Sequence, residues 1–314
     1  MPCGHRAPWG APFVGGLGGL FQQLRIQPAI VRGNVAFAVV MIMAVIVTVI
    51  LIVVMILIVP TLQSSPVSAA VRERLGLDES IAALTPADLI HALLQAPVDL
   101  LYNGGIGTYV KAAAESHADV GDKANDAVRV DGRELRCRSV AEGGNLGFTQ
   151  RGRIEYSAAG GRINTDAVHN SAGVDCSDHE VNLKILLGIP EAAGALTRKQ
   201  RDELLAEVED DVCRHVLYDN YLQVQILSQE SAVAARRMEA YEDLMYELEH
   251  HGMLERDLEF LPSTDRMAER EAAGLGLVRP ELCVLLAYAK RLLRARVLRS
   301  GLPDDPPHHA VLRH

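Results

Sequence analysis

Residues 98–149 read VDLLYNGGIGTYVKAAAESHADVGDKANDAVRVDGRELRCRSVAEGGNLGFT and decide the fold class. Two segments, 98–102 and 135–141, have the length and apolar content of short strands. Each ends in a loop rich in Asn and Gly, at 103–108 and 142–149. In α/β proteins such loops follow the carboxyl ends of parallel strands, where ligands bind. The stretch therefore predicts an α/β fold with a ligand site at these loops.

The segments around these strands complete the predicted α/β pattern. We expect a helix over 109–117 and a short helix over 149–159. Asp131-Gly132 has the composition of a hairpin turn. A further strand over 163–168 would lead into a third polar loop, at 169–177.

Long helices are predicted on both sides of this region. Thr85-Pro86 starts a helix with Thr as the N-cap and Pro at the first position, and that helix should end before Pro97. From about residue 178 onward the spacing of apolar residues is helical. Thr197-x-x-Gln200 is a capping box, Gly252 is a C-cap for the helical segment 199–251, and a last helix should cover 279–300.

The amino-terminal segment has a different character. Residues 35–59 read VAFAVVMIMAVIVTVILIVVMILIV, and at ~1.5 Å per residue a helix of that length crosses a bilayer. We therefore expect a transmembrane helix within 35–60, after a Gly/Pro-rich leader at 1–34. Arg25 and Arg32 precede it, which predicts a cytoplasmic amino terminus and places residues 66–314 outside.

Composition excludes several classes of protein. The 314 residues are 49% apolar, so a packed core is possible and wholesale disorder is excluded. A net charge of −9 leaves no basic surface for nucleic acid, which is therefore not expected as a partner. The five cysteines are widely spaced and form no C-x-x-C, so we expect reduced thiols and a cytosolic compartment for residues 66–314. This expectation conflicts with the outside location that a transmembrane helix would give these residues.

The strand-end loops are the first candidates for chemistry, because Gly lets a ligand approach the backbone and Asn offers a donor and an acceptor. Simple tight turns are the alternative interpretation, and neither G-x-G-x-x-G nor a P-loop occurs. Cys176 and His179 could share a helix face, but two ligands fall short of a zinc site, so no metal is predicted. His117 and His169 could act as general bases, although lone histidines are more often structural.

Several motifs carry a resemblance to a known family. Residues 98–187, with NGGIGTY, AEGGNLGFT and HNSAGVDCSDHEVNLKILL, strongly resemble the large bacterial NAD-specific glutamate dehydrogenases. The resemblance continues through DNYLQVQILSQ, EFLPS and GLVRPELCVLLAYAK and covers about residues 66–314. Residues 1–60 do not resemble that family.

The resemblance implies a fold and an activity. The family oxidises L-glutamate to 2-oxoglutarate and ammonia and reduces NAD, in the cytoplasm and as a homo-oligomer. Residues 66–180 would be the second half of a Rossmann-like dinucleotide-binding domain, and 181–314 a helical C-terminal region. Membrane contact would involve only residues 35–59.

The resemblance also implies roles for single residues. Asn103, Gly104 and Gly105 would line the dinucleotide cleft, and Gly144 would lie in the same cleft. The remaining positions would contact the ligands: Asn145 the cofactor ribose, Asn170 the nicotinamide end, and Ser177 the side-chain carboxylate of glutamate. The lysine and aspartate that drive catalysis are expected upstream, so no catalytic residue is predicted in this chain.

Three functional hypotheses follow. The first is a fragment of an NAD-linked glutamate dehydrogenase, inactive by itself, with residues 1–65 as a non-native leader. The second is a membrane-anchored, non-catalytic nucleotide-binding protein, which detection of the chain in membranes would favour. The third is one subunit of a split glutamate dehydrogenase, which co-purification with a long partner chain would favour.

Overall fold

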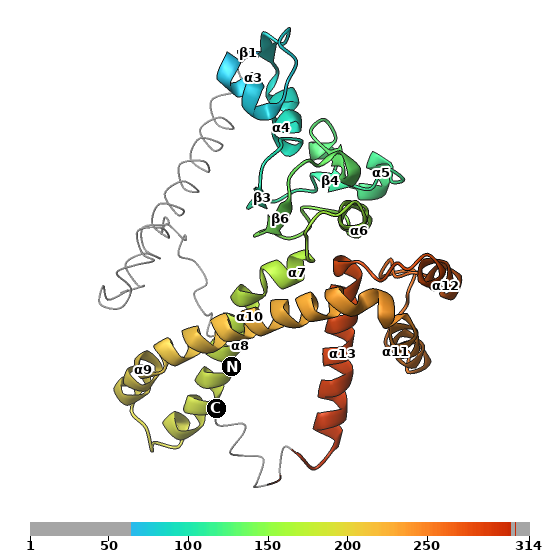
Figure 1. The fold of residues 1–314 in the computed structure, drawn as a ribbon. Coiled ribbons are helices and arrows are strands. Elements are labelled where there is room, and N and C mark those ends of the chain that lie inside the picture. The colour runs from blue at the N-terminus through green and yellow to red at the C-terminus, as the bar shows by residue number, and fades with distance from the viewer. Residues whose placement is uncertain (1–63, 303–304, 306–314) are drawn as a thin grey trace, which may run out of the picture. The chain divides into compact units, whose positions relative to one another are not determined.

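A computed structural model describes residues 64–302 and 305 of the chain (Figure 1). The predicted leader and the predicted transmembrane helix at 35–60 lie outside these residues. No helix within the described part of the chain is both long enough and apolar enough to cross a bilayer. The described residues form a mixed α/β structure with small two-stranded sheets followed by long helices.

Short elements make up the first half of the described chain. In order they are β1 (Ser65–Pro66), α3 (Ala69–Leu75), β2 (Ala83–Leu84), α4 (Pro86–Leu94), β3 (Leu100–Asn103), β4 (Val110–Lys111), α5 (His117–Val120), η2 (Lys123–Asn125), β5 (Val130–Asp131), η3 (Gly132–Glu134), β6 (Ser139–Glu142), α6 (Gln150–Ala158) and α7 (Asp166–His169). The predicted helices over 86–96 and 149–159 are confirmed, and Thr85 and Thr149 accept the backbone N–H bonds expected of N-caps.

Parallel pairing of β3 with β6 confirms the two strands predicted at 98–102 and 135–141. The register runs from Leu100 opposite Ser139 to Asn103 opposite Glu142. Both strands therefore end at the same edge, and the two Asn/Gly loops leave the pair side by side. A second parallel pair joins β4 to β5, and β1 pairs with β2 antiparallel.

Two local predictions between these strands are wrong. Residues 109–117 were expected to be helical, but Val110 and Lys111 form β4, and only residues from His117 onward are helical. Val110 is fully buried and lies opposite Val130, a pairing that local sequence does not reveal. Asp131-Gly132 makes no hairpin. Asp131 is instead the N-cap residue of the short helix η3, and its backbone N–H donates to Glu134 Oε2 at 2.7 Å.

The segment after α6 also differs from the prediction. Residues 163–168 form no strand, and the one β-bridge nearby joins Ser139 to Arg162, just before this segment. Ile163 is buried in the core of the α/β part, whereas Val168 is buried in the core of the helical part. The apolar spacing thus reflects a connector between two cores. The predicted loop at 169–177 is mostly helix, because α8 begins at Ser171.

Long helices make up the second half, as predicted. They are α8 (Ser171–Ala192), α9 (Arg198–Glu207), α10 (Glu209–Val233), η4 (Ala234–Arg236), α11 (Met238–His250), α12 (Thr264–Ala272) and α13 (Arg279–Arg299). The capping box at Thr197 is confirmed, and Gly252 adopts the left-handed conformation with φ 62° just after α11. Leu227, Met245 and Leu248 anchor the core that these helices share.

Candidate functional site

Backbone hydrogen bonds join the two Asn/Gly loops. The N–H groups of Gly143 and Gly144 donate to the carbonyl of Asn103 at 2.8 and 3.3 Å. Farther along, the Thr108 hydroxyl donates to the carbonyl of Leu146 at 2.7 Å. The loops at 103–108 and 142–149 therefore form one surface at the carboxyl ends of β3 and β6.

Close packing at this surface explains why two of its positions, 144 and 147, are glycine. A Cβ at Gly144 would lie 2.5 Å from the carbonyl oxygen of Gly105, and a Cβ at Gly147 would lie 1.8 Å from Asn103 Nδ2. No described residue accepts a hydrogen bond from this buried Asn103 nitrogen. Leu146, between them, has φ 61°, a conformation that costs a leucine roughly 1–2 kcal/mol. Such strain persists only where the surroundings enforce it.

The third polar segment meets this surface through Asn170, the residue that precedes α8. Its side-chain Nδ2 donates to Asn145 Oδ1. The structure therefore brings together Asn103, Gly104, Gly105, Gly144, Asn145 and Asn170, the residues for which the resemblance implies cofactor contacts. The side chains of both bonded asparagines lie at the protein surface, where a ligand can reach them.

A buried ion-pair network holds the Gly143–Gly147 loop from beneath. Arg153 of α6 donates to both carboxylate oxygens of Glu142, from Nε at 2.8 Å and from Nη2 at 2.9 Å. Its Nη2 also lies 3.3 Å from Asp166. Asp166 in turn accepts the N–H of Leu146 at 2.8 Å. Burial works against the Arg153 charge, but Glu142 and Asp166 raise its pKa, so the guanidinium stays charged.

His169 belongs to the support of the site rather than to its chemistry. Its Nδ1 accepts the backbone N–H of Glu142 at 3.1 Å, and its Nε2 lies 3.0 Å from Asn164 Nδ2. Burial, together with the charges of Arg153 and Arg279, lowers the pKa of His169 to about 4. A neutral imidazole held in this way fixes the end of β6 and is a poor general base at neutral pH.

The other candidate histidine, His117, also has a structural contact. Its Nδ1 lies 2.7 Å from Nη1 of Arg129, whose side chain is fully buried. Arg129 also donates to Asp126 at 2.6 Å and to the carbonyl of Thr108 at 2.8 Å. This cluster ties the loop at 103–108 to the segment around β5.

Ser177 lies apart from the hydrogen-bonded loops. It is exposed on α8, and its hydroxyl donates to the carbonyl of Val174 at 2.7 Å within the same helix. Ser177 lies about two helical turns, ~10 Å along the axis, beyond Asn170, the residue that precedes α8.

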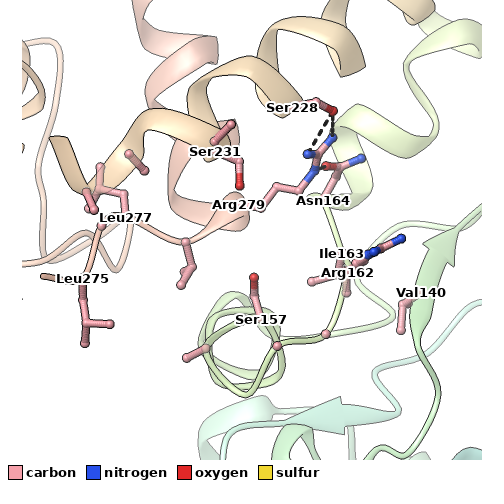
Figure 2. Close-up of a pocket in the computed structure, with 18 of the residues that line it drawn as sticks. Val140, Ser157, Arg162, Ile163, Asn164, Ser228, Ser231, Leu275, Leu277 and Arg279 are labelled. Atoms are coloured by element: carbon pink, nitrogen blue, oxygen red, sulfur yellow. Dashed lines mark hydrogen bonds between the residues drawn. The ribbon is translucent and has the colours of Figure 1, made fainter. Parts of the chain in front are cut away.

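A cavity of about 990 Å³ has His169 among its lining residues. Figure 2 labels ten other residues of its lining. Its walls come from α6, from the Arg162–Asn164 connector, from the end of α10 and from the segment before α13. Arg279 crosses it and donates to Ser228 Oγ from Nη1 and Nη2, both at 3.2 Å. None of the predicted cofactor residues lines this cavity, so it is distinct from the loop surface.

Sequence reasoning missed the supporting network of Glu142, Arg153 and Asp166. Glu142 is predicted to lie in a loop, and the sequence predicts no role for Arg153. Their pairing spans 11 residues and depends on how α6 packs beside β6. The one available signal was a glutamate at the end of a predicted strand, because burying a carboxylate without a partner costs free energy.

The parallel pair with its glycine-rich loops and the long helices that follow place the chain in the broad class of mixed α/β proteins. Many proteins of that class bind ligands at the carboxyl ends of the strands. Residues 58–230 match the family described as "Bacterial NAD-glutamate dehydrogenase, catalytic domain", and residues 274–314 match "Glutamate dehydrogenase, C-terminal". The chain belongs to the bacterial NAD-glutamate dehydrogenase family, an oxidoreductase family whose cofactor is NAD.

Three curated relatives, each called NAD-specific glutamate dehydrogenase, are similar to this chain. The Pseudomonas aeruginosa protein is 57% identical over 222 residues, which cover 71% of this chain and 14% of the relative. The Halomonas elongata protein is 49% identical over 244 residues, covering 78% and 15%. The Mycobacterium tuberculosis protein is 49% identical over 245 residues, covering 76% and 15%. The chain thus spans about 15% of the length of these relatives.

Proposed function

We propose that the loop surface is the cofactor side of an active site that oxidises L-glutamate to 2-oxoglutarate and ammonia with NAD. The observation that carries this proposal is the convergence of three separate polar segments at one edge. Asn103, Asn145 and Asn170 come from different parts of the chain, and hydrogen bonds link their loops. In this proposal the parallel pair belongs to the second half of a Rossmann-like domain covering about residues 66–180, followed by a helical region over 181–314.

The residues present suit a dinucleotide. The buried Nδ2 of Asn103 has no acceptor among the described residues, and leaving such a donor unpaired costs about 1–3 kcal/mol that a polar ligand atom can offset. The exposed amide of Asn145 and the half-buried amide of Asn170 offer donors and acceptors to a ribose or a carboxamide. Gly144 has no side chain, so a ligand can approach the backbone at this position. NAD, when bound, supplies the group that accepts a hydride.

The chain's own residues position the reactants. Asn145 would hold the ribose, Asn170 the nicotinamide end, and Ser177 the side-chain carboxylate of glutamate. Asn170 and Ser177 are separated by ~10 Å along the helix axis. This distance would let Asn170 contact the nicotinamide while Ser177 contacts the far carboxylate of a glutamate held beside it. The Glu142–Arg153–Asp166 network fixes the loop that carries Asn145, so the contact geometry is preset.

Binding of NADH to the full chain tests the proposal. Fluorescence titration should show saturable binding that Asn145→Ala and Gly144→Val each weaken at least tenfold. Asn182→Ala is the matched control, because Asn182 lies on α8 and its amide bonds only to the carbonyl of Asp178 in its own helix. Equal binding by all three variants would contradict the assignment of the loop surface.

Turnover is a separate measurement. Because the chain spans about 15% of its relatives, we expect no glutamate-dependent NADH production from this chain alone. NADH production should appear when the chain is combined with the remaining region of the family enzyme. We place the intact enzyme in the cytoplasm, as a homo-oligomer that acts on glutamate. Robust turnover by the pure chain would refute the expectation of an incomplete site.

A further inference from the structure

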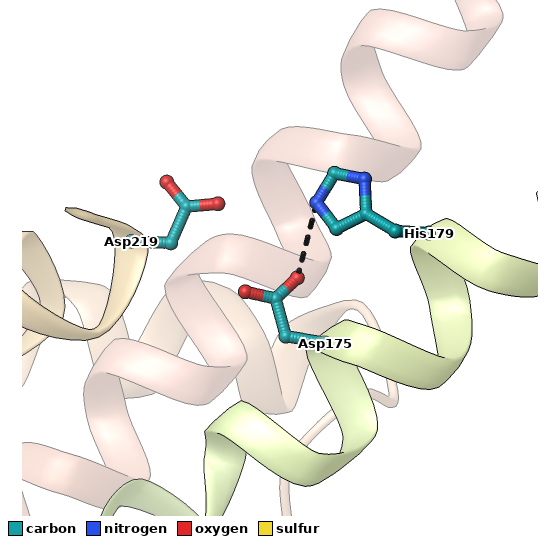
Figure 3. Close-up of side chains that lie close together, drawn as sticks. All are labelled: Asp175, His179 and Asp219. Carbon is teal, nitrogen blue, oxygen red and sulfur yellow. Dashed lines mark ion pairs between the residues drawn. The ribbon is translucent and has the colours of Figure 1, made fainter. Parts of the chain in front are cut away.

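Two long helices bring together aspartate and histidine side chains that come from two separate stretches of the sequence and belong to no recognised motif. Asp175 and His179 lie one turn apart on α8, and Asp219 faces them from α10 (Figure 3). His179 Nε2 is 3.6 Å from Asp175 Oδ1. One ligand atom from each of the three residues lies within 4.8 Å of the others. The sequence alone offered Cys176 and His179 as a pair with no third ligand.

Contacts on either side of the cluster fix how the two helices face each other. Ser171 near the start of α8 donates from its hydroxyl to Asn220 Oδ1 at 2.6 Å and accepts from Gln223 Nε2 at 3.1 Å. Farther along α8, the ring of His179 stacks on His215 of α10, with centroids 6.4 Å apart and planes at 27°. The helices therefore run antiparallel through this region, and the cluster sits between two defined contacts.

Apart from the contact between His179 and Asp175, the carboxylates of the cluster have no cationic partner among the described residues. No lysine or arginine in the described part of the chain forms an ion pair with Asp175 or Asp219. The side chains of Asp175 and His179 are half-buried, 27% and 36% exposed. Two carboxylates held close together without a cation are unfavourable, and a bound cation relieves their repulsion.

We propose that Asp175, His179 and Asp219 form a binding site for a divalent transition-metal cation, of which Zn²⁺ is the representative. The site links α8 to α10. One imidazole nitrogen and two carboxylate oxygens make up a donor set that suits zinc, whereas magnesium and calcium prefer oxygen ligands alone. Three protein ligands leave a coordination position for water, and the stacked ring of His215 orients His179. This site is separate from the loop surface, and its test does not depend on glutamate dehydrogenase activity.

Calorimetric titration of the full, tag-free chain with Zn²⁺ tests the proposal. We expect one Zn²⁺ per chain, a higher Tm in the presence of Zn²⁺, and no competition from excess Mg²⁺. Asp219→Asn and His179→Gln should each weaken binding at least tenfold and remove the Tm shift. These substitutions lie on different helices, and circular dichroism before metal addition checks that each variant is folded.

Two controls separate this site from other sources of metal affinity. His250→Gln changes an exposed histidine on α11 that stacks on Tyr246 and meets His251 edge to face, and it should leave Zn²⁺ binding unchanged. Cys176→Ser and Cys213→Ser should also leave it unchanged, since the proposed ligands are nitrogen and oxygen. Binding that survives Asp219→Asn and His179→Gln, binding lost with either cysteine, or competition by Mg²⁺ would each overturn the proposal, as would less than one Zn²⁺ per chain.

Discussion

Replacing Arg153 by methionine should destabilise the chain strongly, because it strips a buried carboxylate of its partner. Arg153 and Glu142 are 5% and 0% exposed, and two hydrogen bonds of 2.8 and 2.9 Å join them. Removing one member of a buried ion pair costs about 3–5 kcal/mol, mostly through the charge left behind. Methionine keeps much of the side-chain length, so lost packing contributes little of that value.

Urea denaturation of the full chain, followed by circular dichroism, measures the loss. Arg138→Met is the matched control, since Arg138 lies 3.1 Å from Asp99 but both side chains are more than four-fifths exposed, at 82% and 86%. We expect no measurable change there, because exposed pairs contribute little. The double variant Glu142→Leu/Arg153→Met should recover part of the stability that Arg153→Met loses, because the fully buried carboxylate is then gone. Asp166, which is 16% exposed, keeps the hydrogen bond from the N–H of Leu146.

Two outcomes would refute this reasoning. A loss below about 1 kcal/mol for Arg153→Met would mean that the Glu142 carboxylate is solvated or protonated at little cost. A double variant less stable than Arg153→Met would mean that packing, and not the unpaired charge, dominates. Either result would also remove the support that the network gives to the loop carrying Asn145.

Three further predictions concern the same region. Gly147→Ala should lower the free energy of unfolding by about 1–3 kcal/mol and weaken NADH binding, because its Cβ would lie 1.8 Å from Asn103 Nδ2. The control is Gly173→Ala, whose Cβ would have no atom within 4 Å, and it should not lower the free energy of unfolding in the same urea titration. Leu146→Gly should raise the free energy of unfolding by ~0.5–1 kcal/mol, since it relieves φ 61°, and an unchanged or lower Tm would contradict this. Because the pKa of His169 is about 4 when folded and about 6.5 when unfolded, the chain should lose stability as pH falls between these values, and His169→Gln should show a shallower loss in unfolding titrations at pH 7, 5.5 and 4.

The parallel pair β3–β6 could be predicted from the sequence because its signals are local. Short apolar runs are bounded by Gly-rich loops, and the helix starts at Thr85, Thr149 and Thr197 use side chains within three residues of the groups they cap. The convergence of the loops then follows from the rule that parallel strands end at one edge. These parts of the site needed no knowledge of distant contacts.

The wrong predictions all involve groups that distant residues satisfy. Val110 lies in a strand because it pairs with Val130, 20 residues farther along the chain. Asp131 and Gly132, which resemble a turn in sequence, lie instead at the start of the short helix η3 beside α6. A Cβ at Gly132 would meet the carbonyl oxygen of Gly152 at 2.5 Å, so this glycine permits close packing and not a reversal of the chain. Local composition cannot distinguish these uses of glycine.

The contact between Arg279 and Asn164 has a consequence for synthesis of the chain. Arg279 Nε donates to Asn164 Oδ1 across 115 residues. At about 5–20 residues per second, a ribosome needs roughly 6–23 s to add the arginine after the asparagine. During that interval the Asn164 amide oxygen lacks the guanidinium that later binds it. The contact between the α/β part and α13 therefore forms only after most of the helical part has been synthesised.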